Sequence, residues 1–450
     1  MSKDIFLNTK PSRLFVRAAV PGAISMIASS LYIIFESVFV GKFVGTTAFA
    51  ALGMALPVMI MNFALGELVG VGSSVPIAIF LGEGKEDKAN NYFTSAILLT
   101  VLTGIFSGAV IYIFSPTFMS LMGADGELLE YGVKYLRTYA VFSPITPLMF
   151  SLDNYLRISG KTKTSMLLNI MFSVVTVLLE IVFILSLNWG VVGAAFASSI
   201  AMILCVLFAF IMFIPGKLQL KFTKPRISWD MIWQILKNGI TPFLTNISGR
   251  LFSIIMNIFL LRFGGEGAVA VYTVVLTVAC IFEQPMYGVV DSLQPAVGYN
   301  YGAARYDRVI SLEKHVFGTA LAISLLGVVL MLAIPGTLAI PFLEDVSLLP
   351  LAIFATKIAA VAFVFKWLAM CIQCFFMALE KPRRALMISV ASAFAFPMLL
   401  IPIFLPLELT GLWWNYPIST LLTAALAVVI LLLSRRTLFK NDQTKENTQD

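Results

Sequence analysis

Apolar stretches long enough to cross a lipid bilayer recur along the whole chain, and short polar segments separate them. About twenty consecutive apolar residues span the hydrocarbon core as a helix, which satisfies its own backbone hydrogen bonds there. The pattern therefore predicts an all-α integral membrane protein with twelve transmembrane helices. We expect these helices at residues 14–40, 47–80, 91–114, 127–155, 163–187, 190–214, 231–262, 267–300, 314–335, 347–378, 385–406 and 411–434.

The composition agrees with lipid as the solvent. Of the 450 residues, 59% are hydrophobic and 12% are charged, and the mean hydropathy is +0.93. A soluble domain has about one quarter charged residues, so a soluble core does not account for this much apolar sequence. The four cysteines all lie in apolar segments. This placement predicts packing roles for them, with neither disulfides nor a metal site.

Lysine and arginine indicate the direction of the spans. If the N-terminus is cytoplasmic, the external loops hold only Lys42 and Arg262, and the other basic loop residues, Arg157 among them, fall in cytoplasmic segments. Cytoplasmic loops of membrane proteins carry an excess of basic residues. The pattern supports an even number of spans with both termini in the cytoplasm. It also explains the net charge of +7 without nucleic acid as a partner.

The second half of the chain repeats the first at an offset of 220 residues. Segment 41–51 (GKFVGTTAFAA) matches 261–271 (LRFGGEGAVAV), segment 82–89 matches 302–309, and Lys161 matches Lys381. We expect an N-terminal lobe at 1–214, a cytoplasmic linker at 215–237 and a C-terminal lobe at 238–450, related by an internal pseudo-two-fold repeat. Six spans in each lobe make the repeats parallel. Such an arrangement favours a carrier that works by alternating access.

Two glutamates lie deep within predicted spans of the first half. Glu36 is in LYIIFESVFVGKFVG, and Glu180 is in SVVTVLLEIVFIL. A charged side chain at that depth costs about 2.5–3.5 kcal/mol on insertion scales, so a functional role is the first hypothesis. Tyr32 and Thr176 precede them by one helical turn, and Ser198 lies on the next span. Such groups can bind protons or sodium, and the alternative is a structural, hydrogen-bonded carboxylic acid.

Other polar residues in or near spans are candidates for a substrate cavity or for gating. Acids and bases occur together in the second half, so internal ion pairing is the alternative interpretation there. These candidates are Glu67, Asp153, Asn154, Arg250, Glu283, Asp291 and Lys366. No Walker A, HExxH or GxSxG motif occurs, and we expect neither an enzyme nor an ATP-driven pump.

The sequence resembles the multidrug and toxic compound extrusion (MATE) family, in its bacterial branch, over nearly the whole chain. The resemblance is carried by YIIFESVFVGKFVG (32–45), GEGKEDKA (82–89), LDNYLRISGKTK (152–163), NWGVVGAAFASSIA (188–201) and QPAVGYNYGAARYDR (294–308). It implies twelve helices in two lobes. Family members usually carry aspartates where Glu36 and Glu180 stand, and a C-lobe carboxylate found in some members has no clear match here.

The resemblance also implies a function. It implies export of organic, often cationic, compounds in exchange for protons or sodium. We therefore expect Glu36, Glu180, Tyr32, Thr176 and Ser198 to couple the cation, with no other cofactor. We expect a monomer in the bacterial plasma membrane, contacting lipids and small-molecule substrates. A lipid-linked glycan flippase of the same superfamily is the alternative, and a strongly cationic cavity would favour it.

Overall fold

The computed structural model describes residues 2–44, 46–214, 216, 218–343 and 345–438, and all regular secondary structure among them is helical. The first half contains α1 Ser2–Asn8, α2 Pro11–Phe43, α3 Thr46–Gly82, α4 Glu86–Leu121, α5 Gly126–Phe142, α6 Leu148–Ile158, α7 Thr162–Glu180, the π-helical η1 Ile181–Ser186 and α8 Gly190–Phe213. The second half contains α9 Trp229–Ser292, α10 Gln294–Gly302, α11 Tyr306–Ala333, α12 Pro335–Ala339, η2 Ile340–Phe342, η3 Val346–Leu348, α13 Leu349–Ala378, α14 Pro382–Val390, the π-helical η4 Ala391–Ala395, α15 Phe396–Phe404, η5 Leu405–Leu407 and α16 Glu408–Leu438.

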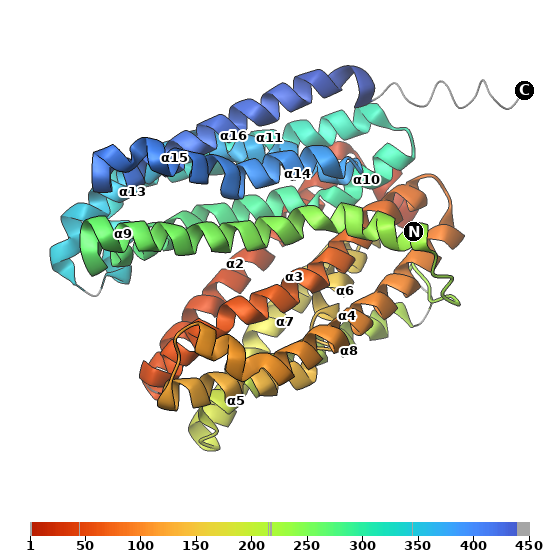
Figure 1. The fold of residues 1–450 in the computed structure, drawn as a ribbon. Coiled ribbons are helices and arrows are strands. Elements are labelled where there is room, and N and C mark those ends of the chain that lie inside the picture. Colours follow the sequence, from red (N-terminus) through yellow and green to blue (C-terminus); the bar gives the residue numbers. More distant parts are fainter. Residues whose placement is uncertain (1, 45, 215, 217, 344, 439–450) are drawn as a thin grey trace, which may run out of the picture.

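The helices account for the twelve predicted spans. Among the described residues, nine stretches are long and apolar enough to cross a membrane. Two of these, Trp229–Gly302 and Pro382–Ser434, have 74 and 53 residues, and each supplies two spans. In α9 the chain leaves helical geometry at Gly265 (φ 66°, ψ −168°) and turns back there in Figure 1. The remaining span is formed by α5 and α6.

The span predicted at 127–155 is broken in its middle. α5 ends at Phe142 and α6 begins at Leu148, with turns between them. Pro144 and Pro147 lie in this break. Proline has no backbone N–H to donate and interrupts a regular helix, which explains why a continuous apolar stretch forms two helices.

The internal repeat is visible in the backbone. Left-handed turn residues recur at the offset of 220, in the pairs Gly84 and Ala304, Gly160 and Glu380, and Asn188 and Glu408. The hydrogen bonds that close these turns recur as well. The Lys85 N–H donates to Phe80 O at 2.8 Å, and the Arg305 N–H donates to Asn300 O at 2.9 Å. The two halves therefore share turn geometry even where their side chains differ.

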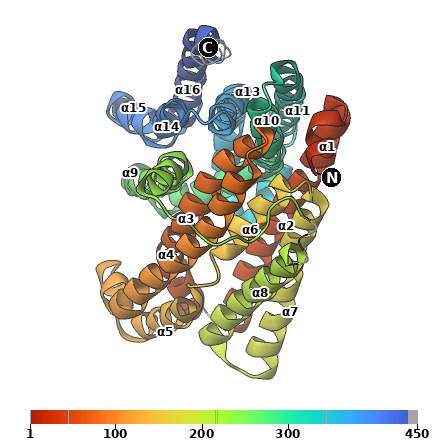
Figure 2. The ribbon, with the colours of Figure 1, turned by 90° about the vertical axis from the view of Figure 1, so that its right-hand side faces the viewer.

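The helices form two groups that meet at one end of the molecule. Figure 1 shows α3, α4, α5, α7 and α8 in one group and α9, α11, α13, α14, α15 and α16 in the other. The groups approach each other at the end that carries the N-terminus and the C-terminal end of α16, which we call the terminal end, and diverge toward the opposite end. Figure 2 views the molecule from that side.

Glycines allow the two groups to touch backbone to backbone. A Cβ at Gly22 of α2 would lie 2.3 Å from the carbonyl oxygen of Gly288 of α9. A Cβ at Gly239 of α9 would lie 1.8 Å from the carbonyl oxygen of Leu68 of α3. Both distances are far shorter than a van der Waals contact. The close approach of α2 and α3 to α9 therefore requires glycine at these positions.

The segment before α9 packs along the start of α4. The Lys221 N–H donates to Asn90 Oδ1 at 2.8 Å, and the Arg226 N–H donates to Asn91 Oδ1 at 2.7 Å. This segment therefore ties the two halves together at the terminal end. α9 begins at Trp229, within the predicted linker. The lobe bounds of 1–214 and 238–450 stay a prediction.

Candidate functional site

The first candidate carboxylate lies on α2. Glu36 is within this helix, but its side chain lies outside the part of the structure that is described. Tyr32, one turn earlier, is buried, and its ring packs edge-on against Phe172 of α7 with centroids 5.2 Å apart. The tyrosine therefore positions this part of α2 against α7, the helix that carries the second carboxylate.

Glu180 ends α7 in a fully buried position. Its exposed fraction is 0%, and the chain continues from it directly into the π-helical turn Ile181–Ser186. Such turns inside helices occur often at functional sites. Thr176 is also buried, one turn before Glu180, and its hydroxyl donates to Phe172 O at 2.7 Å. The carboxyl group and this hydroxyl therefore lie in the interior of the first half, away from lipid.

Ser198 lies on α8 and is buried. Its hydroxyl donates to Ala194 O at 3.2 Å, within its own helix. Because both Ser198 and Thr176 donate to local carbonyl groups, each hydroxyl oxygen can still accept a hydrogen bond or contact a cation. The structure places Glu180, Thr176 and Ser198 inside the first half, and Tyr32 is buried there as well. That these residues act together stays a prediction.

A second polar cluster in the first half was not predicted. Asn62 of α3 donates to the hydroxyl of Tyr139 at 2.6 Å and to that of Ser143 at 3.3 Å, and it accepts a short hydrogen bond from Ser107 of α4. Its exposed fraction is 1%. In the sequence, the only indication of this cluster is the amide of Asn62 inside the apolar stretch 47–80. The cluster joins α3, α4 and the α5 end, and its hydrogen bonds stabilise the packing of the first half.

A buried ionic cluster joins the two halves. Arg157 of α6 pairs with Asp153 one turn earlier and with Asp291 of α9, each at 2.6 Å between nitrogen and oxygen. Arg157 has an exposed fraction of 4%. Arg157 therefore lies within α6 and is buried, and does not lie in an exposed loop; its place on the cytoplasmic side stays a prediction. A buried guanidinium is stable only with such partners, and the basic-loop count could not separate it from exposed residues.

Neutral side chains complete the hydrogen bonds of this ionic cluster. Ser165 of α7 accepts from Arg157 Nε at 3.1 Å and donates to Asp153 Oδ1 at 2.5 Å. Asn169 donates to the same Asp153 oxygen at 2.9 Å, and Gln294 donates to Asp291 Oδ1 at 2.9 Å. The arrangement is a satisfied network, which suits a structural contact or a gate between the halves.

Two more of the candidates lie close by, with different roles. Glu67 of α3 accepts a hydrogen bond from the amide of Asn246 of α9 at 2.9 Å, so it forms another contact between the halves. Asn154 donates to Phe150 O at 3.0 Å, within its own helix. The structure therefore brings Glu67 to α9, whereas Asn154 has a local partner.

Two candidate side chains and a tyrosine meet in the second half. Lys366 of α13 donates to the carboxylate of Glu283 of α9 and, at 2.7 Å, to the hydroxyl of Tyr416 of α16. Tyr416 in turn donates to Glu283 Oε1 at 2.7 Å. The lysine and the glutamate are both about one fifth exposed (23% and 22%). The two charged residues are recognisable in the sequence, whereas the tyrosine is not, since an aromatic residue in an apolar span gives no distinctive signal.

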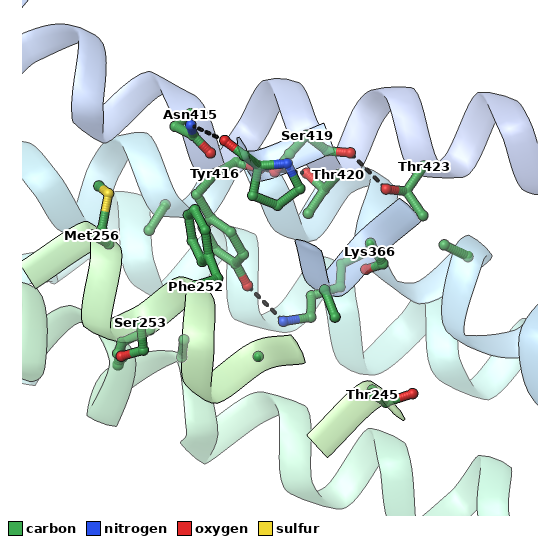
Figure 3. A pocket seen from close by; sticks show the side chains of 18 of the residues that line it. Thr245, Phe252, Ser253, Met256, Lys366, Asn415, Tyr416, Ser419, Thr420 and Thr423 are labelled. Carbon is green, nitrogen blue, oxygen red and sulfur yellow. Dashed lines mark hydrogen bonds between the residues drawn. The ribbon is translucent and has the colours of Figure 1, made fainter. Parts of the chain in front are cut away.

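A cavity of about 500 Å³ lies beside this triad, within the second half (Figure 3). Its wall is formed by both legs of α9, by α13, by the π-helical turn and the start of α15, and by α16. The side chains that line it include Asn246, Gly249, Arg250, Phe252, Ser253, Met256, Tyr272, Lys366, Trp413 and Tyr416. Among the described lining residues, Arg250 and Lys366 carry formal charge. The wall is thus mostly apolar, with a few polar groups that can orient a ligand.

The described side chains do not form a clustered metal site. Within the part of the chain that is described, no three His, Cys, Asp or Glu residues are placed to hold a metal ion together. A sodium ion held by one carboxylate with hydroxyl and carbonyl oxygens is a different arrangement, which needs no such cluster. Binding of a proton needs only the carboxylate.

Comparisons with known proteins agree with this architecture. The family model MatE matches residues 21–182 and 243–403. The multidrug export protein MepA of Staphylococcus aureus (strain N315) is 25% identical over 426 residues, which cover 93% of this chain and 92% of that protein. MepA of Staphylococcus saprophyticus is 23% identical over 429 residues, with the same coverage.

Solved structures share the fold. A transporter of the MOP superfamily from Pyrococcus furiosus matches with a TM-score of 0.90 and 23% identity, covering 97% of this chain and 98% of the other. An outward-facing multidrug resistance transporter of the MATE family matches with a TM-score of 0.90 and 23% identity, covering 96% and 97%. The two-lobe arrangement of twelve spans predicted from the sequence is confirmed by these matches.

Proposed function

Since the chain belongs to the MatE family, whose model matches both of its halves, we propose that it exports amphipathic organic compounds in exchange for protons or sodium. The relatives in staphylococci are named multidrug export proteins, which supports small organic molecules as the substrates. No cofactor beyond the coupling ion is part of the proposal. The proposed unit is a monomer in the bacterial plasma membrane.

The observation that carries the ion-coupling part is the complete burial of Glu180. An ionised carboxylate inside a membrane protein costs free energy, and residues of this kind commonly mark a pathway for an ion or a substrate. In the proposed cycle, cations that enter from the external side neutralise Glu180 and Glu36. Release of the substrate outward follows, and loss of the cation to the cytoplasm restores the charged form.

The orientation in the membrane is proposed from the basic turns. Lys85, Arg305, Lys161 and Lys381 all lie at helix starts on the repeated turns. Cytoplasmic segments carry the excess of basic residues, so we assign the terminal end to the cytoplasm. Contacts between the halves at this end and their divergence at the other support an outward-facing arrangement (Figure 1).

The test is transport in proteoliposomes of the full chain, with proton and sodium gradients imposed independently. We expect efflux of a fluorescent amphipathic compound to depend on one of the two gradients. We also expect Glu180→Gln and Glu36→Gln to lose this dependence, because an amide cannot take up or release the cation. Full, gradient-dependent efflux in both variants would refute the coupling role of these residues.

A flippase for lipid-linked glycans is the second candidate function. Arg250 on the cavity wall favours it, because a lipid-linked glycan carries phosphate. The volume of about 500 Å³ favours a small molecule, since cavities of roughly 300–1,000 Å³ suit ligands of drug size. A lipid-scrambling assay beside the efflux assay separates the two: scrambling without efflux would support the flippase.

A further inference from the structure

We propose that the cavity of the second half binds amphipathic organic anions, and that the guanidinium of Arg250 receives the anionic group. The inference rests on the proposed export function and names a class of substrate for it. It differs from the cations that are expected from the family resemblance.

The two cationic side chains of the cavity wall differ in whether a carboxylate neutralises their charge. Lys366 is paired with Glu283, and the hydroxyl of Tyr416 bonds to both groups. Arg250 is exposed to the cavity that it lines, and no carboxylate among the described residues lies within ion-pair distance of it. The pair contributes little net charge, so the cavity offers the charge of Arg250 to a ligand.

The carboxylate of Glu67, which reaches α9 from the other half, is engaged elsewhere. Asn246 stands one turn before Arg250 on α9 and donates to Glu67 Oε2 at 2.9 Å. Asn246 lines the cavity, whereas Glu67 is not among its described lining residues. This carboxylate is therefore held by an amide between α3 and α9, and it leaves the guanidinium free to bind a ligand.

The wall beside Arg250 has room for an apolar body. A Cβ at Gly249 would meet nothing within 4 Å, so open space adjoins the arginine. Phe252 and Met256 follow along the same helix in Figure 3, and Tyr272 and Trp413 also line the cavity. An aromatic or aliphatic body would pack against these side chains while its anionic end reaches the guanidinium. Arginine binds carboxylates and similar anions with two parallel hydrogen bonds.

An uncompensated arginine inside a membrane protein is itself informative. Its side chain is exposed to a mostly apolar cavity, and charged residues within membrane spans usually face a partner or a pathway for a ligand. The described part of the chain supplies no carboxylate partner for Arg250, whereas it supplies two for Arg157 and one for Lys366. A bound organic anion would complete the site.

The experiment compares two probes that share one body and differ in charge: pyrenebutyrate and pyrenebutyl-trimethylammonium. Their binding to the full chain is measured in nanodiscs of zwitterionic lipid. We expect the carboxylate to bind more tightly. Arg250→Gln should weaken its binding roughly tenfold or more, Arg250→Lys should weaken it less, and neither should weaken binding of the ammonium probe. Gly249→Leu should weaken both probes, because it fills the space shared by their bodies.

Three outcomes would overturn the inference. One is tighter binding of the ammonium probe by the wild-type protein, and another is an equal loss of both probes in Arg250→Gln. The third is displacement of pyrenebutyrate when an anionic lipid is added to the nanodisc, which would assign the site to a lipid headgroup. Gradient-driven efflux of the ammonium probe alone would leave the export function standing. Anion binding without efflux of either probe would refute the export function and leave this inference standing.

Discussion

Arg157 and Arg250 have opposite surroundings, and this difference decides what each side chain can do. Arg157 is 4% exposed and lies 2.6 Å from each of two carboxylates, so its charge is compensated within the protein. Arg250 faces a cavity with its charge available. In the sequence, Arg157 looks like a loop residue, whereas Arg250 is a charged residue within a predicted span. Exposure and partners, which depend on tertiary packing, separate them.

Removing the charge of Arg157 should destabilise the protein strongly. Arg157→Met leaves Asp153 and Asp291 buried without a cation, and breaking a buried pair costs about 3–5 kcal/mol. Thermal unfolding of the protein in detergent measures the loss. The matched control is Lys134→Met, which removes a pair whose side chains are 52% and 61% exposed and should change stability little. Equal unfolding temperatures for both variants would contradict the buried pairing.

At the scale of elements, the sequence predicts helices well and their interruptions poorly. Hydropathy locates all twelve spans because each needs a long apolar stretch. It misses the break between α5 and α6 and the π-helical turns after Glu180 and Val390, because apolar residues there are as frequent as in a regular helix. The repeat at an offset of 220 predicts more: it relates turns in the two halves whose residues differ.

The repeated turn at Gly84 and Ala304 allows a matched test. Both residues are left-handed (φ 78° and 54°), a conformation that costs a residue with a Cβ roughly 1–2 kcal/mol. A Cβ at Gly84 would meet nothing within 4 Å, so only the backbone is affected. We therefore expect Gly84→Ala to lower the unfolding temperature and Ala304→Gly to raise it. A change of the same sign in both variants would be inconsistent with the shared turn geometry.

Packing of glycine between helices gives a second test at this scale. Gly239→Ala places a methyl group against the backbone of α3 at Leu68, so the helices must separate and the protein should become less stable. Gly318→Ala on α11 is the control, because its Cβ would meet nothing within 4 Å. Alanine stabilises an open helix position by about 0.5–1 kcal/mol relative to glycine. Hydrogen exchange of α3 and α9 should rise in the first variant only.

At the scale of the whole molecule, contacts between the halves gather at the terminal end. Besides the buried ionic cluster, the Tyr92 hydroxyl of α4 donates to Gln234 of α9 at 2.5 Å, and Gln234 donates a short hydrogen bond to Glu380. Alternating access requires these contacts to break and re-form. The sequence predicts two lobes from the repeat, but it does not predict which residues join them, since those contacts link positions far apart in the chain.

Holding the terminal end closed should stop transport. Cysteines at Tyr92 and Gln234, joined by a bifunctional maleimide in a variant that lacks the four native cysteines, would tie α4 to α9. We expect gradient-driven efflux from proteoliposomes to be lost on cross-linking, whereas each single-cysteine variant keeps it after the same treatment. Undiminished efflux in the cross-linked protein would mean that this end does not open during transport.

The most direct test of the account is gradient-driven efflux by Glu180→Gln, measured beside exchange of substrate for substrate at equal ion concentrations. Because the carboxylate of Glu180 is fully buried inside the first half, we predict that the variant loses gradient-driven efflux and retains exchange. Exchange moves substrate without net transfer of the ion, so it also shows that the variant is folded. Gradient-driven efflux at the wild-type rate in Glu180→Gln would contradict the account.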